Sequence, residues 1–183
     1  MRGARQVEVN PPVAQEDHVD LIKHARNSAE WYCGAGMKTE SMIREKLRQK
    51  GYPTGPVALA AGGEIDYIEA AIEYCNSLYI VYSDESFCEE VARDGVRAGK
   101  GPLELRQKFM LKGIAQEAVA NCLDEYPVQD AIENGLRKAL RSSGVRKAAN
   151  PHERKQKLIE YYARKGFRFG DIRQALEGVD LED

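Results

Sequence analysis

The fold of this chain is decided by a nine-residue pattern that occurs three times, first as Ile43-Arg44-Glu45-Lys46-Leu47-Arg48-Gln49-Lys50-Gly51. The second copy is Leu105-Arg106-Gln107-Lys108-Phe109-Met110-Leu111-Lys112-Gly113, and the third is Leu158-Ile159-Glu160-Tyr161-Tyr162-Ala163-Arg164-Lys165-Gly166. The glycines are 62 and 53 residues apart. Self-similarity at such a period is typical of stacked supersecondary units. The pattern therefore predicts a tandem array.

Each copy is predicted to be the end of an amphipathic helix. Apolar residues stand eight and four positions before each glycine, and residues four apart share one helix face. Glycine after lysine ends a helix, because glycine adopts the left-handed conformation and the cation faces the negative end of the helix dipole. The residues expected to be buried are Ile43, Leu47, Leu105, Phe109, Leu158 and Tyr162.

A further amphipathic stretch lies on each side of every copy. Apolar sets before and after the first pattern, for example, are Leu21, Ile22, Ala25 and Ala29, then Ile65, Ile68, Ile72 and Cys75. Helix starts are indicated by Thr39, by Gly101-Pro102 and by Asn150-Pro151. The predicted fold is all-α, an elongated tandem array of three three-helix repeats.

The predicted organisation follows from these stretches. Repeat one covers residues 19–82, repeat two 83–126 and repeat three 127–178, with a disordered leader over 1–18 and a tail over 179–183. Repeat one carries an insertion at about 53–63, whose glycines and prolines predict a flexible loop.

Composition favours a soluble, cytoplasmic, helical protein, which we also expect to be a monomer and to need no cofactor. Lys and Arg total 27 against 29 Asp and Glu, and no apolar run approaches the roughly 18 residues of a membrane span. The N-terminus has no apolar segment typical of a signal peptide. Cys33, Cys75, Cys88 and Cys122 form no Cys-x-x-Cys pair, so reduced buried thiols are expected. No cysteine or histidine set has the spacing of metal ligands.

Charge is unevenly distributed along the chain. Between Gly51 and Ala92 there is no Lys or Arg, whereas residues 134–173 hold twelve basic and three acidic residues. A solvated helix face is the ordinary interpretation of any single one of these residues. Clustered cations nevertheless attract phosphates or an acidic protein surface through a long-range field.

Together these motifs resemble the RecX family of recombinase regulators. The resemblance rests on the three helix ends, on Ser83-Asp84-Glu85-Ser86-Phe87, on Gly99-Lys100-Gly101-Pro102-Leu103-Glu104-Leu105-Arg106, and on Lys165-Gly166-Phe167-Arg168-Phe169-Gly170-Asp171-Ile172-Arg173-Gln174-Ala175-Leu176. It covers about residues 19–177. Gly-Lys-Gly-Pro at that distance before a Leu-Arg-x-Lys-Phe helix is a specific signal, whereas a lone Lys-Gly is not.

The resemblance implies a curved protein without catalytic activity. Members of this family bind the RecA filament on single-stranded DNA, lie in its groove and reduce strand exchange and the coupled ATP hydrolysis. They thereby regulate DNA repair by homologous recombination and the SOS response. A repeat array presents a long concave surface rather than a closed pocket, which fits such a partner.

The sequence departs from the family pattern in three places. The 53–63 insertion is the first. The second is the segment 27–36 with Trp31, interpreted as a linker, which lacks the family's arginines and leaves the length of the first helix open. In the third copy, Ile159 stands where the other copies have Arg44 and Arg106.

Candidate partner-binding residues are the cations that recur on the polar side of these helices and at their ends. They are Arg44, Lys46, Lys50, Arg97, Lys100, Arg106, Lys108, Lys112, Arg164, Lys165, Arg168 and Arg173. No catalytic or metal-binding residue is predicted.

The alternative interpretation is a helical module that binds nucleic acid directly. Tyr161, Tyr162, Phe167 and Phe169 lie among basic residues and could stack on bases. The net charge of −2 argues against this as the main function, and the same aromatic residues are good core residues. Weak affinity for single-stranded DNA is compatible with the first interpretation.

Overall fold

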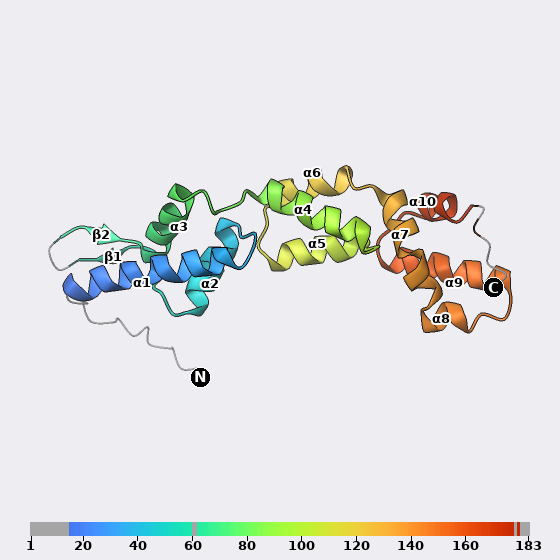
Figure 1. Cartoon of the computed structure of the whole chain (residues 1–183), viewed down its shortest axis with the longest axis horizontal. Coiled ribbons are helices and arrows are strands. Elements are labelled where there is room, and N and C mark those ends of the chain that lie inside the picture. The colour runs from blue at the N-terminus through green and yellow to red at the C-terminus, as the bar shows by residue number, and fades with distance from the viewer. Residues whose placement is uncertain (1–14, 60–61, 178, 180–183) are drawn as a thin grey trace, which may run out of the picture. The chain divides into compact units, whose positions relative to one another are not determined.

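The computed structural model describes residues 15–59, 62–177 and 179. The chain divides into two compact units, residues 1–82 and 83–183, which are described separately (Figure 1). The described residues are mainly helical and contain one short two-stranded hairpin, which confirms the predicted all-α class.

The first unit is built on three helices, α1 (Gln15–Gly34), α2 (Glu40–Gln49) and α3 (Tyr67–Ser77). Helices α1 and α3 pack along each other, and α2 contacts both. The buried cluster between them contains Ala25, Ala29, Cys33, Ile43, Leu47, Tyr67, Ile68, Ala71, Ile72 and Cys75. The apolar sets predicted for this unit therefore converge on one core.

Helix α1 is longer than predicted at both ends. Residues 1–14 of the predicted leader lie outside the described residues, but Gln15 to His18 belong to α1. His18 is buried, and its Nδ1 hydrogen-bonds the hydroxyl of Tyr67 on α3. The interpretation of residues 27–36 as a linker is also wrong, because Ala29 and Cys33 extend the buried stripe of Ala25 and keep the chain helical to Gly34.

The insertion contains regular structure. Strands β1 (Val57–Ala58) and β2 (Glu64–Ile65) pair antiparallel, with Val57 opposite Ile65. Residues 60–61 lie outside the described residues. The part of the insertion described here thus includes one strand of a hairpin where a loop was expected.

The second unit contains seven described helices. They are α4 (Asp84–Arg97), α5 (Pro102–Leu111), α6 (Gln116–Asp124), α7 (Val128–Leu140), α8 (Ser143–Arg146), α9 (Pro151–Arg164) and α10 (Phe169–Ala175). Helix α4 packs on α6 and α7, and α7 packs on α10 and α9 (Figure 1). The short helix α8 is an addition to the predicted pattern.

The predicted helix ends are confirmed. Gly51, Gly113 and Gly166 have φ of 87°, 70° and 90°, the left-handed conformation that glycine adopts without steric cost. The six apolar pattern residues Ile43, Leu47, Leu105, Phe109, Leu158 and Tyr162 are all fully buried.

The predicted helix starts are confirmed too, with one difference in detail. Asn150 Oδ1 accepts a hydrogen bond from the Glu153 N–H at 2.8 Å, and Pro102 is the first residue of α5. Thr39 precedes α2, but its buried hydroxyl makes no cap hydrogen bond. Backbone conformation, and not side-chain capping, therefore marks the start of α2.

The Gly99-Lys100-Gly101-Pro102 turn packs against the end of α9. The Leu103 N–H donates to the Lys165 carbonyl at 3.0 Å, and Lys165 Nζ donates to the Gly99 carbonyl at 3.1 Å and to Glu104 Oε2 at 2.9 Å. A Cβ on Gly101 would overlap the Lys165 carbonyl oxygen, and one on Gly99 would lie 2.7 Å from Gly135 N. This contact, here called the glycine joint, therefore requires residues without side chains.

Candidate partner-binding surfaces

Three of the predicted cations form a cluster at α5. Burial, together with the charges of Lys100 and Lys112, lowers the pKa of Lys108, and Asp94 opposes this effect. Within the described ranges, no carboxylate lies within salt-bridge distance of these three lysines. An anion that approaches neighbouring positive charges reduces the repulsion between them. The lysine cluster, Lys100, Lys108 and Lys112, is thus suited to an anionic partner.

The backbone holds Lys100 in a defined place. Its N–H donates to the Gly95 carbonyl at 2.8 Å, and its carbonyl accepts from the hydroxyl of buried Tyr126 at 2.7 Å. The turn is further packed in the glycine joint. A cation on such a fixed turn loses less conformational entropy on binding than one on a mobile loop.

Arg106 and Arg168 line one hollow in the second unit. The hollow measures about 370 Å³ and lies beside the start of α5, the end of α6 and the start of α10. Asp124 and Asp171 line it as well, but neither arginine forms a salt bridge in the part of the chain that the structure describes. Both arginines are among the binding residues predicted from the sequence, but the sequence did not indicate that they line the same hollow.

Other predicted site residues have partners within the fold. Arg44 forms an ion pair with Glu69, with a hydrogen bond of 3.1 Å, and Arg97 lies 3.3 Å from Asp94. Lys50 donates to Ser28 Oγ at 3.1 Å, and Lys46 lies over the Tyr32 ring. Such pairs at the surface contribute little to stability and can be exchanged for a partner. These four residues stay predicted binding residues.

Lys165 is largely enclosed, with a side chain 13% exposed. Its ammonium group contacts Gly99, Glu104 and the ring of Tyr161. Although burial raises the pKa of Glu104, the hydrogen bonds from the Gly101 N–H and from Lys165 lower it below its ordinary value overall. Lys165 therefore holds the glycine joint together. Arg164, the predicted binding residue that precedes it, is exposed to solvent.

The aromatic residues considered for base stacking differ in their exposure to solvent. Tyr162 and Phe167 are buried and pack edge to face, with ring centroids 5.5 Å apart, so they cannot stack on a base. Phe169 is 53% exposed and lies under Arg173, whose Cζ is 4.6 Å from the ring centroid. Together with Ile159 these two residues line a second hollow, at the groove between α9 and α10.

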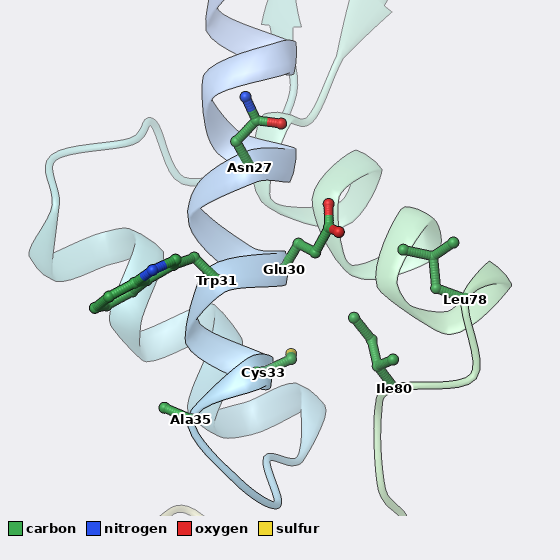
Figure 2. A pocket seen from close by; sticks show the side chains of 8 residues that line it. Asn27, Glu30, Trp31, Cys33, Ala35, Leu78 and Ile80 are labelled. Carbon is green, nitrogen blue, oxygen red and sulfur yellow. The ribbon is translucent and has the colours of Figure 1, made fainter.

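An apolar hollow in the first unit was not predicted. It lies between α1 and the segment after α3, and Trp31, Leu78 and Ile80 line it (Figure 2). The presence of Trp31 could have indicated a binding surface. Residues 27–36 were interpreted as a linker, however, whereas Trp31 belongs to α1.

The thiols are ordinary buried cysteines. Burial raises the pKa of both Cys75 and Cys88 to about 12, so both stay protonated near neutral pH. Cys33 is buried as well, and Cys122 is half-buried. Among the described residues, no three His, Cys, Asp or Glu side chains are grouped as metal ligands, and no helix has the length and hydropathy to cross a membrane.

Comparison with known proteins identifies the family. Residues 25–60 match the first three-helix domain of RecX, and residues 83–123 match its second three-helix domain. The regulatory protein RecX of Agrobacterium fabrum is 30% identical over 154 residues, which cover 81% of this chain and 79% of that protein. The RecX of Bacillus licheniformis is 27% identical over 165 residues, or 90% of this chain and 58% of the relative's own length.

Solved structures show the same fold. The crystal structure of RecX from Lactobacillus salivarius matches with a TM-score of 0.68 at 21% identity, over 89% of this chain and 99% of the other. A second crystal structure, of regulatory protein RecX, also has a TM-score of 0.68 at 20% identity and covers 97% of this chain. From its motifs, its three-helix domains and its similarity to these relatives, the chain belongs to the RecX family of regulatory proteins.

Proposed function

We propose that this protein regulates a RecA recombinase by binding the RecA filament on single-stranded DNA. It would lie in the filament groove and limit filament extension, strand exchange and ATP hydrolysis, without catalysis or a cofactor of its own. The lysine cluster is the observation that supports this best. Among the described residues no carboxylate forms a salt bridge with its three lysines, and such a surface suits a groove that contains DNA phosphates or acidic side chains.

The further features of the proposal come from the sequence. The protein would act in the cytoplasm as a monomer with three repeats. The first repeat includes all of α1 from Gln15, and the others cover residues 83–126 and 127–178. Arg106 and Arg168 would add to the cationic surface from one shared hollow.

Reversing charge in the lysine cluster should weaken filament binding without unfolding the protein. We expect the double variant Lys100→Glu, Lys112→Glu to bind at least about tenfold more weakly at low salt, because like charge now faces the anionic groove. The difference should shrink at high salt, where exposed charges are screened. The measurement is inhibition of DNA-dependent ATP hydrolysis by RecA at two salt concentrations.

A matched control is the double variant Arg146→Glu, Lys147→Glu, which makes the same charge change at exposed positions around the end of α8. Both variants should melt within about 0.5 kcal/mol of the parent, because Lys112, Arg146 and Lys147 are exposed and Lys100 is only half-buried. Equal inhibition by the two double variants and the parent at both salt concentrations would show that the lysine cluster is only a solvated surface.

An extended array should also be visible in solution. If the three repeats contact only their neighbours in sequence, the radius of gyration should lie well above the about 16 Å expected of a compact globule of 183 residues. Small-angle scattering measures this directly. A value near that of a globule would remove the argument for binding along a groove.

Direct binding to single-stranded DNA is the second candidate, and exposed Phe169 beside Arg173 is the observation that favours it. Gel shifts with single-stranded DNA alone separate the two. If binding to DNA without RecA is as strong as binding to the filament, the second candidate holds.

A further inference from the structure

A hollow of about 760 Å³ lies on the surface of the first unit. Figure 2 shows Leu78 and Ile80 pointing toward Glu30 and Cys33 on α1, while Trp31 extends from the opposite side of the same helix. We call this surface, made by Glu30, Trp31, Cys33, Leu78 and Ile80, the Trp31 groove. Helix α1 ends at Gly34, which also lines the groove. A Cβ on Gly34 would meet no atom within 4 Å, so the groove is not covered beside this residue.

The apolar side chains around the groove are unusually exposed. Of the residues that line it, Trp31 is 80% exposed and Leu78 41%, and Tyr79, which follows Leu78 in the chain, is 95% exposed. Tyr79 also has φ of 56°, which is uncommon for a residue with a side chain and directs the chain sharply after α3. Single exposed apolar residues need no explanation, but several beside one hollow mark an interaction site. Tryptophan is also the residue most enriched where binding energy concentrates.

The charge around the groove selects the kind of partner. Glu30 is the one charged residue among those that line it, and none of them is basic. Its carboxylate accepts a hydrogen bond from the Tyr74 hydroxyl at 3.1 Å and keeps lone pairs for a further donor. Residues 51–92, which supply α3 and the segment after it, contain no Lys or Arg. Arg26, one turn earlier on α1, is placed over the Tyr74 ring.

We propose that the Trp31 groove docks a protein segment that crosses α1. The segment covers Trp31 on one side of the helix, and on the other side it places an aliphatic side chain between α1 and Leu78, next to a lysine or arginine that pairs with Glu30. Nucleic acid fits less well, because its phosphates would face the Glu30 carboxylate, and the nearby Lys38 already donates to the Gly36 carbonyl and lies over the Tyr32 ring. This inference rests on the proposed function, so the segment belongs to a RecA subunit. The first unit would then contact protein, while the lysine cluster of the second unit meets the anionic part of the filament.

Hydroxyl-radical footprinting with mass spectrometry tests the contact directly, because Trp31 is the chain's single tryptophan and is highly exposed. The full-length protein is oxidised alone and with RecA filaments preformed on poly(dT) with a slowly hydrolysed ATP analogue. We expect filaments to slow the oxidation of Trp31 at least about fivefold, since the core of an interface excludes water. Val19, 64% exposed on the same helix, should keep its rate.

Substitutions test whether the contact contributes to affinity. Trp31→Ala should weaken co-sedimentation with filaments about 10- to 30-fold, as expected for an interface hot spot. Glu30→Lys should weaken it about tenfold, and Glu30→Gln less, because the amide oxygen still accepts hydrogen bonds. The matched control Val19→Ala should bind within about twofold of the parent, and all four variants should melt like it, since the altered side chains are exposed.

The outcomes separate this inference from the proposed function. If the parent protein does not co-sediment with filaments, the proposed function is wrong and the groove assignment fails with it. If it co-sediments while Trp31 is oxidised as fast as in the free protein, or if Trp31→Ala binds equally well, only the groove assignment is wrong. Protection of Trp31 that grows with protein concentration in the absence of RecA would assign the groove to a second copy of this chain and overturn the proposal.

Discussion

Replacing Gly101 by alanine is expected to destabilise the second unit by about 3 kcal/mol or more. The new Cβ would overlap the Lys165 carbonyl oxygen and lie 2.7 Å from its carbonyl carbon. Both are backbone atoms at the end of α9, so no side-chain rotation relieves the overlap, and overpacking of this kind costs more than the usual range. The Leu103 and Lys165 hydrogen bonds that depend on this approach would weaken as well. Chemical denaturation followed by circular dichroism measures the change.

Gly170→Ala is the matched control for Gly101→Ala. Gly170 lies within α10, and a Cβ there would meet no atom within 4 Å. Alanine should therefore leave stability unchanged or raise it by up to about 1 kcal/mol through its better helix propensity. Similar melting curves for Gly101→Ala and Gly170→Ala would contradict the close packing assigned to the glycine joint.

Replacing Phe109 by alanine should cost about 3 to 5 kcal/mol of unfolding free energy. Phe109 is fully buried in the second pattern helix, and its removal loses both the transfer free energy of the ring and the packing around it. A loss of this size is a large fraction of the stability of a small domain. The variant should therefore lose regulatory activity by unfolding, which thermal denaturation and a RecA ATP-hydrolysis assay can show together.

The neighbouring residue provides the control for Phe109→Ala. Met110 follows it directly in α5 and is 67% exposed. Met110→Ala should move stability by no more than about 0.5 kcal/mol. If both substitutions cost the same, the assignment of Phe109 to the core and Met110 to the surface would be wrong.

Local patterns predicted the helices better than the connections between them. The spacing of Leu105 and Phe109 and the glycine at 113 were sufficient for α5, because helix periodicity and the left-handed conformation act within a few residues. The same reasoning failed at Asn27 to Gly34. There the small residues Ala29 and Cys33 carry a weak apolar signal, and it is packing against α3 that keeps the chain helical.

For the candidate binding residues, too, the sequence predicted local features but not contacts between distant residues. Sequence reasoning selected twelve cations by their recurrence, but recurrence does not indicate which carboxylate lies opposite each of them. The structure pairs Arg44 with Glu69 and Lys165 with Glu104, residues that are 25 and 61 positions apart. Among the described residues, no carboxylate forms a salt bridge with Lys100, Lys108 or Lys112.

The sequence by itself determined where the pattern helices end, which of their residues are buried and to which family the motifs are similar. The helix ends and the spacing of the apolar residues depend on interactions within one or two helical turns, which a short stretch of residues specifies. Only the tertiary structure decided that Gly99 packs against α7 and Gly101 against the end of α9, and that Leu78 and Ile80 form a groove with Trp31. Both depend on the distance between segments far apart in the chain, which is set by the packing of whole helices.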